Sequence, residues 1–259
     1  MSALPIQIHE TKRRLVLTQG GKGGTGKTTL ITALVDWYDA HSYPYTLIDL
    51  DTEASKARGS LVHYFPGKAA KVDINHPNGL DRLLNSLQDG PPIVVADMGA
   101  GAGAAAYAWF DDVYEGAREL GVAFTAIGLI TPDPATTDSV LKWAGALQNR
   151  TDYLIVKNSV SNPADFTVWE EGDRAKQFRA KLNGEQIEGE RPTLEIIQME
   201  YHHPALEFES RNHGLSVGRV ADGKHDVTEL HQFTVRIRAQ KYRRNIFAEF
   251  DRVSGVLLP

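Results

Sequence analysis

Short apolar runs alternate with amphipathic segments along most of the chain, and this alternation predicts the fold. The runs are apolar almost throughout, which is typical of strands that are buried on both faces of a parallel sheet. We expect six strands, over residues 15–19, 45–50, 93–96, 122–130, 153–156 and 194–198.

The segments between these runs have helical periodicity. Helices are predicted over 27–40, 78–88 and 135–147, and another around Tyr107, Phe110, Val113 and Ala117. Strands that alternate with helices at this spacing predict an α/β fold with a doubly wound, mostly parallel sheet flanked by helices. Because residues 183–192 form a polar loop without linker character, the whole chain, 1–259, is expected to be one domain.

A long helix is predicted near the end of the sequence, from about 226 to 253. One of its faces is apolar, and five cations lie around the remainder: Arg236, Arg238, Lys241, Arg243 and Arg244. Such a helix is either docked with a solvated basic face or contacts the phosphates of DNA without reading its sequence. The sequence leaves both interpretations open.

A glycine-rich loop, QGGKGGTGKTTL, stands between the first strand and the first helix. Residues 21–28 match GxxxxGK[ST], the P-loop pattern, in which backbone N–H groups and a helix N-terminus surround phosphates. Lys27 would neutralise the phosphates and Thr28 would ligate Mg²⁺. A glycine-rich turn with a chance Lys-Thr is disfavoured by the flanking strand and helix. The predicted nucleotide-binding residues here are Gly21, Lys22, Gly23, Gly24, Thr25, Gly26, Lys27, Thr28 and Thr29.

Two aspartates follow apolar strands of the same predicted sheet. Asp51 ends the segment IDLD and Asp97 follows residues 93–96, so both are expected at the carboxyl edge, where open α/β sheets bind ligands. A buried acid that caps a turn is the alternative for each. On a P-loop sheet, however, two such acids favour a hydrolytic site that holds Mg²⁺ and positions water.

Composition narrows the class of protein. The 259 residues are 42% hydrophobic, carry a net charge of −5 and include no cysteine. A sizeable core is therefore possible, bulk affinity for nucleic acid is not favoured, and thiolate metal sites and a cysteine nucleophile are excluded. No apolar stretch approaches the ~20 residues of a membrane span, so we expect a cytoplasmic protein.

The segment KGGTGKTT resembles the deviant Walker A motif of the ParA/MinD class of P-loop ATPases. The resemblance implies a homodimer that sandwiches two ATP molecules, in which Lys22 reaches the partner's phosphates; the alternative for Lys22 is a solvated surface lysine. It also implies catalytic roles for Lys22, Lys27 and Asp51, with Asp51 orienting the attacking water. Thr28, Asp51 and Asp97 would hold Mg²⁺.

The sequence departs from the class at two places. Thr52-Glu53 follows Asp51 where Pro-Gln is usual, and Met98-Gly99 follows Asp97 where proline is common. These departures concern the segments that couple hydrolysis to conformation, so the rate of turnover is the property they affect. The absence of cysteine also excludes the usual forms of the nitrogenase-reductase and tail-anchored-protein targeting branches.

Asn158 bears on the choice of base. Guanine-binding P-loop proteins use NKxD, whereas Asn158 is followed by Ser159, Val160 and Ser161. An asparagine at this strand end resembles the adenine-contacting residue of the ParA/MinD class, which favours ATP over GTP. The adjacent pair His202-His203 could suggest a metal site, but adjacent side chains on an extended chain point in opposite directions. We therefore expect this pair in a loop near the base.

The resemblance implies a slow ATPase, stimulated by a protein partner, that positions or partitions plasmid or chromosomal DNA or a protein assembly. The pattern is similar to plasmid-transfer and plasmid-stability members of the TraL type. The alternative is a P-loop ligase or kinase of the dethiobiotin-synthetase or cobyrinate-amidase type. Membrane positioning of the MinD kind is less favoured, because Glu249 and Asp251 weaken an anionic-lipid anchor.

Overall fold

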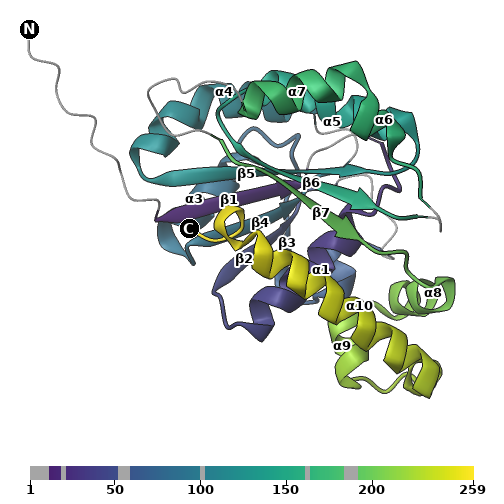
Figure 1. The fold of residues 1–259 in the computed structure, drawn as a ribbon. Helices are drawn as coiled ribbons and strands as arrows, with labels where there is room; N and C mark the ends of the chain where they lie inside the picture. The colour runs from purple at the N-terminus through teal and green to yellow at the C-terminus, as the bar shows by residue number, and fades with distance from the viewer. Residues whose placement is uncertain (1–11, 19–21, 52–58, 100–102, 161–163, 184–191) are drawn as a thin grey trace, which may run out of the picture.

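The computed structural model describes residues 12–18, 22–51, 59–99, 103–160, 164–183 and 192–259. Strands and helices alternate along this part of the chain (Figure 1). The strands are β1 Arg13–Thr18, β2 Tyr45–Asp49, β3 Ala69–Lys71, β4 Ile93–Asp97, β5 Val122–Ile130, β6 Asp152–Asn158 and β7 Leu194–Met199. The helices are α1 Lys27–Ala40, α2 Leu61–Tyr64, α3 Asp81–Asp89, α4 Gly103–Glu119, α5 Pro134–Leu147, α6 Thr167–Glu171, α7 Asp173–Asn183, α8 Pro204–His213, α9 Val217–Asp222 and α10 Phe233–Arg252, with 3₁₀ turns η1 Thr228–His231 and η2 Ser254–Val256.

The seven described strands form one sheet in the order β3-β2-β4-β1-β5-β6-β7, and every neighbouring pair is parallel. The predicted α/β architecture is thus confirmed, and the parallel pairing is complete rather than partial. The strand order reverses direction at β1, so the loop after β1 lies at a topological switch point, where ligands bind in such sheets.

Helices cover both faces of the sheet (Figure 1). Successive residues of β1 alternate between two cores, because side chains alternate across a strand. Val16 packs with α1, α9 and α10, whereas Leu15 and Leu17 pack with α3, α4 and α5. Burial on both faces explains why the strands are almost wholly apolar in sequence.

Two elements differ from expectation. The edge strand β3 was not predicted, because it is short and largely exposed and therefore has no apolar run. The C-terminal helix begins at Phe233 rather than near residue 226, since the chain first makes the turn η1, which buries Leu230. The apolar stripe of that helix is confirmed, and its buried members are Val235, Ala239, Tyr242, Ile246 and Phe250.

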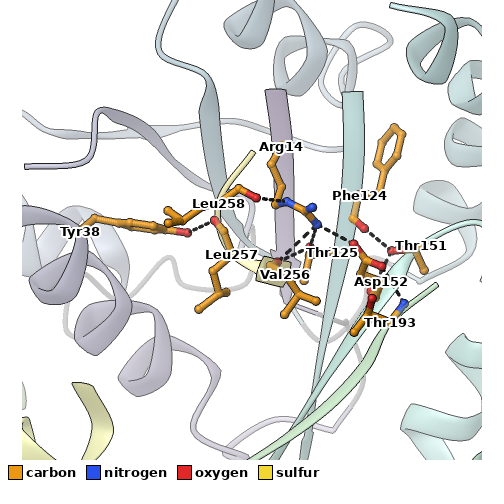
Figure 2. A network of polar contacts seen from close by, with 10 residues as sticks. All are labelled: Arg14, Tyr38, Phe124, Thr125, Thr151, Asp152, Thr193, Val256, Leu257 and Leu258. Atoms are coloured by element: carbon orange, nitrogen blue, oxygen red, sulfur yellow. Dashed lines mark hydrogen bonds and ion pairs between the residues drawn. The ribbon is translucent and has the colours of Figure 1, made fainter. Parts of the chain in front are cut away.

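The segment after α10 packs into the sheet. Val256 and Leu257 are buried, and the backbone carbonyls of residues 256–258 accept hydrogen bonds from Arg14, Tyr38 and Thr125 (Figure 2). The side chains of Val256 and Leu257 are therefore part of the core, and Leu258 is partly buried against it. Within the described residues, no helix has both the length and the apolarity that a membrane crossing requires.

Candidate nucleotide site

The described part of the glycine-rich loop, residues 22–26, leads directly into α1. Gly26 precedes the helix with a φ of 94°, a left-handed conformation that favours glycine, and no side chain caps the helix. The first backbone N–H groups of α1 therefore have no side-chain partner at the N-cap and are free to bind an anion. Lys27 Nζ donates to the Lys22 carbonyl at 3.3 Å, across the same loop. Gly21 lies outside the described residues.

Asp97, at the end of β4, joins the loop helix to the central strand. Thr28 Oγ1 donates to Asp97 Oδ2 at 2.7 Å, and Thr18 Oγ1 donates to Oδ1 at 2.9 Å. The Met98 N–H in turn donates to Thr18 Oγ1 at 2.8 Å. Burial raises the pKa of Asp97 to about 6, although the two threonine hydrogen bonds act in the opposite direction. A buried carboxylate with hydroxyl partners and a raised pKa is a good candidate for binding a cation.

Asp49 and Asp51 lie beside Asp97 at the same edge of the sheet. Asp49 is 1% exposed and stands directly opposite Asp97 in the register of β2 and β4. Its Oδ1 accepts from the Asp51 N–H at 3.0 Å, whereas its Oδ2 is buried without a hydrogen-bond partner among the described residues. Burial raises the pKa of Asp49 as well. Two buried carboxylates on adjacent strands thus concentrate negative charge at one point.

Asp51 is held close to the segment that follows Asp97. A Cβ placed on Gly99 would lie 2.6 Å from Asp51 Oδ1 and 3.1 Å from Asp51 Cα, so the Asp51 side chain would have to shift to admit it. The glycine after Met98 therefore has a steric role: it lets the two strand-end segments approach. Residues 52–58 and 100–102, which continue these segments and include Thr52-Glu53, lie outside the described residues.

Lys22 lies at the rim of the loop. Its side chain is about half exposed and forms an ion pair with Asp133. Asp133 also caps α5, because its Oδ1 accepts from the Ala135 N–H at 3.0 Å. The hydrogen bond from Lys22 lowers the pKa of Asp133.

Asn158, the last residue of β6, is 7% exposed and lies against the loop. Its Nδ2 donates to the Thr25 carbonyl at 2.8 Å. The role predicted for this side chain was a contact with the base; its observed partner is the backbone of the phosphate loop.

The phosphate loop and the ends of β4 and β6 line one open cavity of about 390 Å³. The cavity brings together most of the residues that the sequence predicts for the site: Gly23, Gly24, Thr25, Gly26, Lys27, Thr28, Thr29, Asp51, Asp97 and Asn158. Lys22 is not part of the wall. An oxygen-rich set composed of the Thr28 hydroxyl and the carboxylates of Asp51 and Asp97 is the donor set that Mg²⁺ prefers. The residues present are therefore suited to a magnesium ion.

The sequence did not single out several other residues of the cavity wall. They are Gly59, Tyr64, Met98, Ser159, Val160, Met199, Glu200, Tyr201, Glu207 and Arg211. Residues 199–201 could have been inferred, since they follow the carboxyl end of a parallel strand. Tyr64, Glu207 and Arg211 belong to short helices, and no sequence pattern marks them.

The two histidines separate as expected for neighbours on an extended chain. His202 reaches the cavity wall, and its ring lies edge-on to Tyr242 at 3.9 Å between centroids. Burial lowers the pKa of His202 to about 4, so the imidazole is neutral at pH 7. His203 is exposed and caps α8, where its Nδ1 accepts from the Ala205 N–H at 3.3 Å.

The predicted basic surface lies on α10, outside the cavity wall. Arg236, Arg238, Lys241 and Arg244 are exposed, whereas Arg243 is partly buried in an ion pair with Asp222. Phe233 and Ile237 are 79% and 47% exposed on the same helix.

A comparison with solved structures finds similar chains, among them chains of MinD, of a MinC:MinD complex and of FlhF. The MinD cell division protein of Aquifex aeolicus is 14% identical, with a TM-score of 0.51, over 95% of this chain and 98% of that one. The MinC:MinD complex of the same organism gives 15% identity, a TM-score of 0.48 and the same coverage. FlhF complexed with GTP/Mg²⁺ gives 12% identity and a TM-score of 0.41, over 76% of this chain and 69% of that one. At these identities the likeness concerns the fold alone.

The sequence itself matches a family model. The model is described as the CobQ/CobB/MinD/ParA nucleotide binding domain, and it covers residues 16–153, more than half of the 259 residues. The matched region contains the phosphate loop, Asp51 and Asp97, which the structure places around one cavity. None of the curated proteins is similar enough in sequence to count as a match. The chain belongs to the CobQ/CobB/MinD/ParA family of nucleotide-binding domains.

Proposed function

We propose that this protein is a magnesium-dependent ATPase that works as a nucleotide-sandwich homodimer, in the manner of the ParA/MinD branch of its family. The observation that carries the proposal is the cavity in which the phosphate loop, Thr28, Asp97 and Asp51 converge. A 390 Å³ site of this polarity is of the size that holds a small ligand.

Each residue of the cavity has a distinct role in this proposal. Lys27 is cationic and the loop N–H groups are partly positive, so both bind and orient the phosphates. Thr28 and Asp97 hold Mg²⁺, which, when bound, neutralises charge on the phosphates. Asp51, close to the same edge, orients the attacking water. ATP is preferred to GTP because the sequence after Asn158 lacks the aspartate that pairs with guanine.

Lys22 is the residue that would act on the partner subunit. It lies outside the cavity wall, its side chain is 48% exposed, and its contact with Asp133 is between two exposed groups. Such surface pairs contribute little to stability, because water and salt screen them. Lys22 can therefore exchange Asp133 for a phosphate of the neighbouring subunit at small cost.

The test is the molecular mass of the protein in solution. It is measured once with ADP and once with a non-hydrolysable ATP analogue plus magnesium. We expect a monomer with ADP and a dimer with the analogue, and we expect Lys22→Ala to stay monomeric in both. Lys176→Ala, which removes an exposed lysine on α7, is the matched control and should dimerise normally. A mass that ignores the nucleotide would refute the sandwich.

The cargo proposed for the dimer is plasmid or chromosomal DNA, or a protein assembly, with a protein partner that stimulates hydrolysis. Arg236, Arg238, Lys241 and Arg244 supply exposed cations for phosphate contacts. If they bind DNA, replacing all four by glutamine should weaken non-specific binding and flatten its dependence on salt. Arg243→Gln is the comparison, because Arg243 already pairs with Asp222.

One observation favours the alternative of a small-molecule ligase or kinase. The cavity extends past the phosphate loop to Tyr64, Glu207 and Arg211, which provide aromatic, acidic and basic contacts. A second substrate bound there would make ADP release depend on that substrate, without dimerisation. The mass measurement above therefore separates the two functions.

A further inference from the structure

Asn158 joins two parts of the nucleotide site that are distant in sequence. It ends β6, and its side chain is bonded to Thr25, 133 residues earlier, in the phosphate loop. The contact is short, at 2.8 Å between Asn158 Nδ2 and the Thr25 carbonyl oxygen, and both residues are buried. A hydrogen bond that is shielded from water is a stronger restraint than one at the surface.

The loop backbone packs closely against Asn158. A Cβ on Gly26 would lie 2.5 Å from Asn158 Nδ2 and 3.3 Å from Met199 Cε. The loop backbone at Gly26 therefore rests directly on the ends of β6 and β7. Glycine is required there both for this approach and for its φ of 94°.

The planarity of the peptide bond turns this contact into a constraint on the loop. The Thr25 carbonyl and the Gly26 N–H belong to one trans peptide, in which the two groups point in opposite directions. When Asn158 holds the carbonyl toward β6, the Gly26 N–H must point away from β6. The orientation of one anion-binding N–H group is then set by a side chain outside the phosphate loop.

We infer that Asn158 is a positioning residue for the phosphate loop. Its side chain sets the affinity of the site for the phosphates, whatever base the nucleotide carries. The inference rests on the proposed nucleotide-binding function. It differs from a contact with adenine in a measurable way. A base contact changes affinity for ATP alone, whereas a positioned loop changes affinity for every ligand that carries the same phosphates.

The experiment uses the full chain and three probes, each with magnesium: ATP, GTP and inorganic tripolyphosphate, which has no base. Titration calorimetry gives the affinities of wild type, Asn158→Ala and Gln240→Ala. We expect Asn158→Ala to lose affinity for all three probes by a similar factor, about tenfold, the size of one buried hydrogen bond. Gln240→Ala is the control: it removes an exposed amide on α10 that donates to the Ala221 carbonyl away from the cavity wall, and it should leave all three affinities unchanged.

Asn158→Asp provides a readout that simple loss of packing would not give. At pH 8 its carboxylate faces the Thr25 carbonyl with no proton to donate, so tripolyphosphate affinity should fall further than in Asn158→Ala. As the pH falls, the protonated carboxyl regains a donor, and the ratio of variant to wild-type affinity should rise. The ratio cancels the protonation of the probe itself.

Three outcomes are decisive. A loss confined to ATP would overturn the inference and restore the base contact. A ratio for Asn158→Asp that stays flat with pH, in a protein whose melting temperature matches wild type, would overturn it as well. If wild type binds none of the probes, the proposed nucleotide function fails instead, which is a distinct result.

Discussion

The central strand β1 carries a buried polar cluster at each end, and the two clusters are built on opposite principles. At its start, Arg14 donates to Thr125 Oγ1 and to Asp152 Oδ2, each at 2.7 Å, and to the Leu258 carbonyl at the same distance (Figure 2). At its end, Thr18 contacts Asp97, which stands beside a second buried acid.

The difference between the ends lies in how charge is compensated. The Arg14 cluster pairs a cation with an anion and satisfies their hydrogen bonds within the protein. The Asp97 cluster places two buried acids, Asp49 and Asp97, on adjacent strands. Burial raises the pKa of both, although Lys71 and Lys27 act in the opposite direction. The comparison teaches that burial of polar groups is not itself a sign of function. The informative feature is buried charge that the surrounding protein neutralises incompletely.

The largest effect is expected when the compensated cluster is broken. Arg14→Leu leaves Asp152 and the carbonyls of the C-terminal segment without their cation, so the free energy of unfolding should fall by about 3–5 kcal/mol, as for other broken buried pairs. Chemical denaturation measures the loss. Arg13→Leu is the control, and it should cost far less. Equal losses in the two variants would mean that the Arg14 cluster is not special.

The uncompensated cluster should respond in the opposite direction. Asp97→Asn keeps groups that can bond both threonines but removes a buried charge, so above pH 7 the free protein should gain about 3 kcal/mol of stability. The same variant should lose magnesium-dependent nucleotide binding. A variant that is destabilised at pH 8 would contradict the assignment of uncompensated charge.

The pH dependence of this effect has a definite sign. Because the folded-state pKa of Asp97 is raised, from 3.8 to about 6, the folded protein binds the proton more tightly than the unfolded chain does. The contribution of Asp97 to stability is therefore full below about pH 4 and is lost as the pH rises to about 6. The difference in unfolding free energy between wild type and Asp97→Asn should be measured from pH 4 to 8. It should grow from about pH 4 to about pH 6 and then level off.

A smaller effect is expected where the two acidic segments approach each other. In Gly99→Ala the new Cβ would meet Asp51 at 2.6 Å, so the carboxylate must move. We expect the rate of hydrolysis to fall about tenfold, since misplacing a catalytic group by a fraction of an ångström weakens its action, while nucleotide affinity changes little. In Gly103→Ala, the control, the nearest atoms are 3.7 Å away on Tyr107. An unchanged rate in Gly99→Ala would remove the support for a catalytic Asp51.

The smallest effect concerns one neutral bond of the compensated cluster. Tyr38 Oη donates to the Leu257 carbonyl at 2.8 Å, and Tyr38→Phe removes only this bond. The expected loss is about 1 kcal/mol, the usual net value of a neutral hydrogen bond. Thermal unfolding at one pH is sufficient to measure it, and a loss as large as that of Arg14→Leu would show that the charges of this cluster contribute little.

The sequence predicted the sheet and the phosphate side of the site well, for a physical reason. Strands buried on both faces must be apolar, and the phosphate loop requires glycines, a lysine and a hydroxyl residue at fixed spacing. These local requirements leave a local signature. The same holds for Asp97, which follows an apolar strand and lies at the edge where ligands bind.

Other features could not be predicted, because they depend on contacts between distant segments. The bond from Asn158 to Thr25 spans 133 residues, and Arg14 and Asp152 are separated by 138. Nothing near Arg14 in the sequence distinguishes it from Arg13, which precedes it. The edge strand β3 and the short helix α2 have too few residues to show periodicity. The similarity to plasmid-transfer proteins stays a prediction.

The bonds from Arg14 to residues 256 and 258 also have a consequence for synthesis. Val256 and Leu258 leave the ribosome 242 and 244 residues after Arg14. Until they arrive, the Arg14 guanidinium can pair with Thr125 and Asp152 but lacks two of its carbonyl acceptors. A chain that is stalled before residue 256 should therefore form the sheet with this cluster only partly bonded.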